Sequence, residues 1–144
     1  MAALREMEIA DYPEVIRLWS ATEAMQLRDA DSYESIARYL KRNPGLSFVA
    51  LDGEAIIGAI LVGTDGRRGY LQHLAVDSRC RNQGIGKQLI AAAIAALAAE
   101  GVAKTHLFVA NENKNAQRLY QKLGWFARDE VRMFSFNSSL NGNV

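Results

Sequence analysis

The stretch that decides the fold runs from Arg79 to Lys87 and reads Arg-Cys-Arg-Asn-Gln-Gly-Ile-Gly-Lys. It follows an apolar run typical of a strand, Leu71 to Val76, and precedes a helix-like run, Gln88 to Ala99. Gly84 and Gly86 let the backbone turn sharply and leave room for a ligand, because neither carries a Cβ atom. The start of a helix adds unpaired N–H groups and a partial positive charge. The stretch therefore predicts an anion site, and phosphate is the anion that suits it best.

Two common phosphate-loop patterns fail on this stretch. A Walker loop, G-x-x-x-x-G-K-[ST], would need its first glycine at Arg81 and a Ser or Thr at Gln88. A dinucleotide fingerprint, G-x-G-x-x-G, would need its third glycine at Leu89. The remaining pattern is Arg81-x-x-Gly84-x-Gly86, which could also be a plain glycine-rich turn with basic residues on its surface. A nucleotide-binding switch is therefore the weakest functional interpretation.

Composition limits the class of protein. The chain has 144 residues, enough for one domain with its own core. Lys and Arg number 17 against 16 Asp and Glu, so neither a nucleic-acid partner nor a membrane surface is predicted. The one cysteine, Cys80, excludes an internal disulfide and a cysteine metal cluster, and no metal is expected. The charged N-terminus does not resemble a signal peptide. We expect a cytoplasmic protein with a single domain over residues 1–136 and a disordered tail over 137–144.

Hydrophobic periodicity and turn residues predict an α/β fold with a mixed central sheet flanked by helices. Strands are expected over 4–7, 47–51, 55–63, 69–76 and 105–109, with a closing pair over 125–128 and 131–136. Helices are expected after Asp11 and Asp31 as N-caps, over 88–99 and over 115–123. Strand 105–109 follows a helical crossover, so it should run parallel to strand 69–76. The resulting order is β-α-α-β-β-β-α-β-α-β-β.

A second motif begins at Asn113 and reads N-x-x-A-x-x-L-Y-x-x-x-G-W, ending at Trp125. It resembles an element of the GNAT N-acetyltransferases, and the loop Arg81-x-x-Gly84-x-Gly86 resembles the coenzyme A pyrophosphate loop of the same family. Two motifs in the right order, each on the expected element, are more specific than either alone. The resemblance covers residues 4 to 136. Within the family, the chain is similar to small bacterial members such as the ribosomal-protein alanine acetyltransferases.

The resemblance implies a function and a set of site residues. It implies acetyl transfer from acetyl-CoA to a primary amine of a small molecule or a protein, by direct attack in a ternary complex. The implied loop residues for the cofactor are Arg81, Asn82, Gln83, Gly84, Ile85, Gly86 and Lys87. Backbone groups of Leu74, Ala75 and Val76 would bond the pantetheine where their strand splays from its neighbour, a splay that the sequence does not show. Asn113 would bond the pantetheine arm, cap its helix, or do both.

Tyr120 is the catalytic residue that the resemblance implies. A phenol can donate a proton to the departing thiolate, so Tyr120 would be the general acid and would also line the cofactor site. Because Asn113 and Tyr120 lie seven residues apart in an expected helix, both can project toward one cleft.

The general base and the acceptor are left open. Positions where family members often carry Glu hold Tyr70 and Phe108. His73 is the nearest titratable alternative, although a lone strand histidine is more often structural, so ordered water is our first expectation for the base. The missing carboxylate favours a rival class, a non-catalytic acyl-CoA-binding sensor, whereas Tyr120 favours an enzyme. Neither the acceptor amine nor the choice between monomer and homodimer can be read from the sequence.

Overall fold

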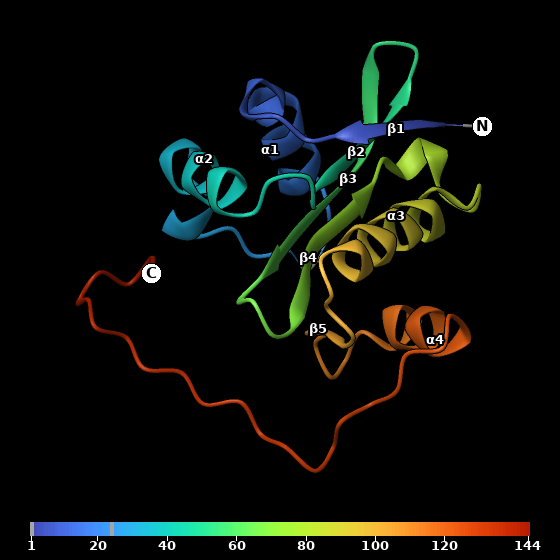
Figure 1. Cartoon of the computed structure of the whole chain (residues 1–144). Coiled ribbons are helices and arrows are strands. Elements are labelled where there is room, and N and C mark those ends of the chain that lie inside the picture. Colours follow the sequence, from blue (N-terminus) through green and yellow to red (C-terminus); the bar gives the residue numbers. More distant parts are fainter. Residues whose placement is uncertain (1, 24) are drawn as a thin grey trace. The chain divides into compact units, whose positions relative to one another are not determined.

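The computed structural model describes residues 2–23 and 25–144 and contains two compact units, one ending at Leu107 and one over Phe108–Val144. The first unit is built on a five-stranded sheet in the order β1-β2-β3-β4-β5 (Figure 1). Its strands are β1 (Ala3–Glu6), β2 (Phe48–Asp52), β3 (Ala55–Thr64), β4 (Gly69–Val76) and β5 (Thr105–Leu107). Its helices are α1 (Tyr12–Ser20), α2 (Tyr33–Arg42) and α3 (Ile85–Ala99), with short 3-10 turns η1 (Ile9–Asp11), η2 (Asp29–Asp31) and η3 (Ser78–Cys80).

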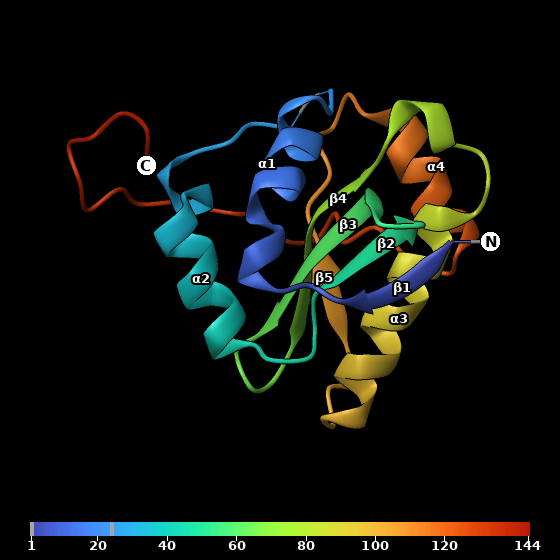
Figure 2. The same cartoon turned by 90° about the horizontal axis from the view of Figure 1, so that it is seen from above.

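Strand directions follow from the connections between the strands. β1, β2, β3 and β4 are antiparallel to their neighbours, whereas β4 and β5, which α3 connects, run parallel. α1 and α2 lie on one side of the sheet and α3 lies on the other (Figure 2). The predicted mixed sheet flanked by helices is therefore confirmed, including its parallel pair.

Each face of the sheet buries its own apolar set. On the α1 and α2 face these side chains are Val15, Trp19, Ile36, Val49, Ala59, Leu61 and Ala75. On the other face α3 buries Ile85, Leu89, Ile90, Ala93 and Leu97. The approach of α3 is close, since a Cβ atom at Gly58 would lie 3.1 Å from both Ile85 Cγ2 and Leu89 Cδ1. Tight packing at Ile85 fixes the first turn of α3 against the sheet, which matters because the glycine loop leads into that turn.

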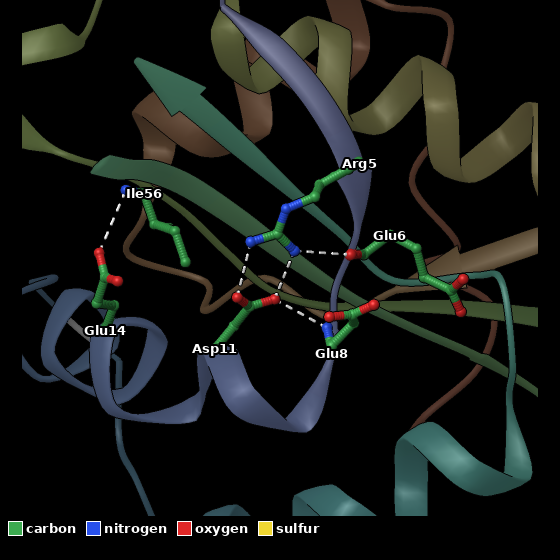
Figure 3. Close-up of polar contacts among 6 residues, drawn as sticks. All are labelled: Arg5, Glu6, Glu8, Asp11, Glu14 and Ile56. Atoms are coloured by element: carbon green, nitrogen blue, oxygen red, sulfur yellow. Dashed lines mark hydrogen bonds and ion pairs between the residues drawn. The ribbon is translucent and has the colours of Figure 1, made fainter. Parts of the chain in front are cut away.

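An ion pair joins β1 to the start of α1 (Figure 3). Arg5 Nη1 and Nη2 donate to the two carboxylate oxygens of Asp11, each at 2.8 Å. The Glu8 backbone N–H donates to Asp11 Oδ2, also at 2.8 Å. The hydrogen bond from Arg5 is the largest of the effects that hold the pKa of Asp11 below its ordinary value.

An Arg5→Met variant should lower the free energy of unfolding by about 1 kcal/mol at neutral pH, a modest effect because the Arg5 side chain is 42% exposed and solvent screens the pair. A carboxylate with a lowered folded pKa stabilises the fold above its unfolded pKa and loses that contribution as the pH falls through the folded value. The stability difference should therefore shrink as the pH falls below about 5, where carboxylates of the unfolded chain begin to take up protons. Urea unfolding across this range measures it, with exposed Arg17→Met on α1 as the control. A pH-independent difference would contradict the assignment.

The second unit has one regular element, α4 (Lys114–Lys122), after which Gly124 adopts a positive φ of 96°. The closing strands predicted over 125–128 and 131–136 are wrong, because in the described ranges no strand follows β5. The apolar side chains of the second segment are exposed, from 62% at Val131 to 91% at Phe136. Alternating apolar residues favour a strand only where a partner strand supplies hydrogen bonds and a buried face, and this segment has neither.

Candidate active site

Two positive backbone angles build the loop between β4 and α3. Asn82 has a φ of 64°, and Gly84, the N-cap of α3, has a φ of 80°. Glycine is favoured at position 84 because a residue with a Cβ atom would be strained at a φ of 80°. The first intrahelical hydrogen bond of α3 runs from the Gln88 N–H to the Gly84 carbonyl, at 3.0 Å. The N–H groups of the three helix residues before Gln88 therefore have no acceptor within the helix. The loop therefore presents a row of backbone donors at a helix N-terminus, which suits an anion.

The loop lies beside the end of β4. A Cβ atom built on Gly86 would lie 3.9 Å from both Leu74 Cδ2 and Val76 Cγ2, and Arg81 Nε donates to the Val76 carbonyl at 3.3 Å. The structure thus brings together, in the first unit, the two segments that the resemblance implies for the cofactor.

β4 extends beyond its parallel neighbour. The β4–β5 ladder consists of Gly69 with Thr105, Tyr70 with His106 and Leu71 with Leu107. Residues 72–76 of β4 continue past the last of these pairs. Within the first unit these residues have no partner strand on that side, and an extended amide chain can add to a strand edge of this kind.

The basic residues of the loop differ in how closely a carboxylate of the protein already binds them. Arg79 is held by Asp77 through Nε and Nη2 at 3.1 and 3.0 Å, and this contact is the main reason why the pKa of Asp77 falls to about 2. Arg81 makes a longer contact with exposed Glu23, at 3.8 Å, and over residues 2–23 and 25–144 Lys87 forms no ion pair. Arg81 and Lys87 are therefore the cations that the loop offers to an anion. With the open space at Gly84, they fit the pyrophosphate of coenzyme A.

Asn113 and Tyr120 belong to the second unit. Asn113 Oδ1 accepts from the Ala116 N–H at 3.2 Å, so its side chain caps α4. The Tyr120 ring lies 5.8 Å from the Trp125 ring in an edge-on arrangement. Burial raises the pKa of Tyr120, so the phenol is protonated at neutral pH. Its hydroxyl bonds to no other side chain or backbone group in the described part of the chain, which leaves it able to donate.

A β-bulge in β4 places His73 in an unusual backbone conformation. Ala59 pairs with Ala75 and Leu61 pairs with Gln72, so two residues, His73 and Leu74, lie opposite Ile60. His73 has a φ of 47°, a left-handed conformation that costs a non-glycine residue on the order of 1–3 kcal/mol. Strain of this kind occurs most often at functional sites.

The His73 side chain is tied to a buried carboxylate. His73 Nε2 lies 2.7 Å from Asp31 Oδ1, and the imidazole ring lies 4.9 Å from the Trp19 ring. Asp31 is 7% exposed, and its Oδ2 accepts from the Arg28 N–H at 3.0 Å.

The prediction of Asp31 as the N-cap of α2 is wrong. Ser32 occupies that position, and its Oγ accepts from the Ser35 N–H at 3.2 Å. Both residues are good caps, and the one adjacent to the helix takes the role. Asp31 Oδ1 instead meets His73, a pairing that no local signal in the sequence could have indicated.

Known proteins match this chain in sequence and in fold. The sequence matches the acetyltransferase (GNAT) family over residues 2–125. An acetyltransferase of Yersinia enterocolitica is 30% identical over 130 residues, which are 90% of this chain and 92% of that protein. N-alpha-acetyltransferase 30 of Homo sapiens is 41% identical over 111 residues, which cover 73% of this chain and 30% of the human protein. The crystal structure of PaiA N-acetyltransferase from Thermoplasma acidophilum in complex with coenzyme A has a TM-score of 0.78 at 20% identity, covering 90% of this chain and 92% of that one.

The fold and these matches define the class of acetyl-CoA-dependent N-acetyltransferases. The chain belongs to the acetyltransferase (GNAT) family, in which acetyl-CoA is the acetyl donor. Residues 2–23 and 25–144 contain no cluster of three or more His, Cys, Asp or Glu side chains that could hold a metal ion. In the same ranges no helix is long and apolar enough to cross a membrane.

Proposed function

We propose that this chain transfers the acetyl group of acetyl-CoA to a primary amine, of a small molecule or a protein, by direct attack in a ternary complex. The observation that carries the proposal is the glycine loop at the N-terminus of α3, beside the end of β4 that continues past β5. Residues 1–136 would act as one domain, with 137–144 as a disordered tail.

Each segment has a proposed role in holding the donor. Backbone N–H groups of the loop, with Arg81 and Lys87, bind the pyrophosphate. Backbone groups of residues 74–76 bond the amides of the pantetheine as an added strand would, and Asn113 bonds the same arm. These contacts align the thioester, which acetyl-CoA supplies as the activated acyl group, for attack by the amine nitrogen.

Tyr120 has a proposed role in the chemistry itself. Its protonated phenol donates to the sulfur as the carbon–sulfur bond breaks, so the thiolate leaves as a thiol. The raised pKa of Tyr120 supports this role, because only the protonated phenol can donate.

Release of coenzyme A thiol across a panel of amines tests the function. The panel should contain diamines, an aminoglycoside, lysine peptides and peptides with free N-termini, each with an amine-free blank. Amine-dependent thiol release together with an acetylated product supports the proposal. Binding of acetyl-CoA without release for any amine would favour the sensor, and binding of ATP or NAD in preference to coenzyme A would favour a nucleotide switch.

Arg81→Ala and Lys87→Ala should each weaken coenzyme A binding about tenfold, because each removes a charge-assisted contact to phosphate. Pantetheine, which has no phosphate, should bind these variants and the wild type equally. Arg79→Ala is the matched control from the same loop, and it should have little effect because Arg79 is held by Asp77. Calorimetry with both ligands measures this. Equal losses for coenzyme A and pantetheine would mean that the phosphates lie elsewhere.

A further inference from the structure

His73, in the β4 bulge, directly precedes residues 74–76, which we propose bind the pantetheine of the donor. If the pyrophosphate lies at the α3 N-terminus, the pantetheine runs back along β4 from Val76 to Leu74, and its thioester end points further in the same direction. His73 is the next residue along that path, about 3.3 Å of strand rise from Leu74. The reacting end of the donor is therefore expected near the bulge, on the side of β4 away from the phosphate loop.

The imidazole presents one of its two nitrogens for chemistry. An ionised carboxylate only accepts hydrogen bonds, so Nε2, which lies 2.7 Å from Asp31 Oδ1, carries the hydrogen. That tautomer leaves the lone pair on Nδ1, which bonds to no other residue in the described ranges. The His73 side chain is 20% exposed, whereas Trp19 beneath it is fully buried. The ring thus has one anchored nitrogen and one that can receive a proton.

The surroundings of the pair hold both side chains in a fixed arrangement. Asp31, from η2, is the charged group that the structure brings within ion-pair distance of His73 in the described residues, and Trp19 is the aromatic neighbour from α1. The Asp31 carboxylate accepts a hydrogen bond from the Arg28 backbone N–H, and the backbone carbonyl of Asp31 accepts one from the Tyr12 hydroxyl at 2.7 Å. Two elements beyond β4 therefore hold Asp31 in place.

We propose that His73 is the general base that takes the proton from the acceptor amine, and that Asp31 is the residue that positions it. The proposal rests on the proposed function and replaces ordered water as the base. The amine nitrogen forms a bond to the acyl carbon, the carbon–sulfur bond breaks, one amine proton passes to Nδ1 of His73, and the thiolate sulfur takes a proton from Tyr120. The amide and the thiol leave, and His73 and Tyr120 then exchange their protons with solvent.

A His73→Gly variant tests the base without disturbing the backbone, because glycine adopts a φ of 47° without strain. We expect kcat/KM to fall about 10²–10⁴-fold while acetyl-CoA affinity stays within about twofold. The acid limb of the pH profile of kcat/KM should disappear. Added imidazole should restore part of the rate in proportion to its concentration. His73→Asn, also tolerated at positive φ, serves if the glycine variant does not fold.

Asp31→Asn tests the positioning role. The rate should fall about tenfold or more with KM for acetyl-CoA unchanged, because the imidazole loses the carboxylate that holds its tautomer and orientation. A second measurement needs no turnover: ¹⁵N NMR of the ligand-free protein should show His73 protonated on Nε2 in the wild type and a tautomer mixture in Asp31→Asn. A purely structural tie between η2 and β4 would change stability and leave the acid limb and the imidazole response unaffected.

The outcomes separate this proposal from the proposed function. If a folded His73→Gly variant keeps the turnover of the wild type and the acid limb of its pH profile, His73 is not the base. The proposed acetyltransferase function would then still stand. Coenzyme A binding without transfer to any amine would overturn both. Loss of turnover in His73→Gly with no response to imidazole and with weakened acetyl-CoA binding would mean that His73 holds the site together, which also overturns the base.

Discussion

A Gly86→Val variant is expected to fold like the wild type and to lose measurable coenzyme A binding. Gly86 is the second residue of α3, where valine has no lower helix propensity than glycine. Its Cβ atom would meet only Leu74 and Val76, at 3.9 Å, which is ordinary van der Waals contact. The Cβ atom therefore has room beside the end of β4, and the two methyl groups of valine extend from it into the region between the loop donors and that strand end. That is the space which the proposed pyrophosphate and pantetheine need.

Calorimetric titration with coenzyme A and thermal unfolding on the same preparation measure the effect of Gly86→Val. Ala95→Val places the same β-branched side chain at an exposed position later in α3, and its affinity should equal that of the wild type. Gly84→Ala provides a comparison with Gly86→Val. Alanine is strained at a φ of 80°, so this variant should lower the free energy of unfolding by about 1 kcal/mol. Unchanged affinity in a folded Gly86→Val variant would exclude the loop from the donor site.

Local signals in the sequence were sufficient for most of the fold. The bounds of β4 were predicted as observed, since an apolar run flanked by a hairpin and the glycine loop has clear ends. The stops at Gly101 and Gly124 were also predicted correctly, and both glycines have a positive φ, as helix ends require. These features depend on a few neighbouring residues, so sequence pattern determines them.

Features that depend on distant partners could not be predicted in the same way. The length of the β4–β5 ladder depends on where two strands part, which no residue of β4 alone records. His73 and Asp31 are 42 positions apart, and each had an adequate local explanation, one as a strand histidine and the other as a helix cap. The segment after Trp125 shows the converse, because its alternation predicted a strand that lacks a partner.

A Tyr120→Phe variant is expected to lose about 10²–10⁴-fold in kcat, because it removes the general acid and keeps the ring. Acetyl-CoA affinity should change little, since a thioester sulfur is a weak acceptor until charge develops on it. Stability should also change little, because the hydroxyl bonds to no other group in the described part of the chain. The burial that raises the pKa of Tyr120 keeps the phenol protonated, so loss of its proton should not lower kcat below about pH 10.

Three readouts on one preparation of Tyr120→Phe distinguish the possible roles of this tyrosine: kcat, acetyl-CoA affinity and thermal unfolding. Tyr70→Phe is the matched control, since it removes a hydroxyl that donates to Asp65 Oδ2 at 3.3 Å on the surface of the first unit. It should leave kcat unchanged. A core role for Tyr120 predicts lower stability with normal turnover per folded molecule, and a sensor predicts no wild-type turnover to lose. Normal kcat in a stable Tyr120→Phe protein would assign protonation of the thiolate to another group or to solvent.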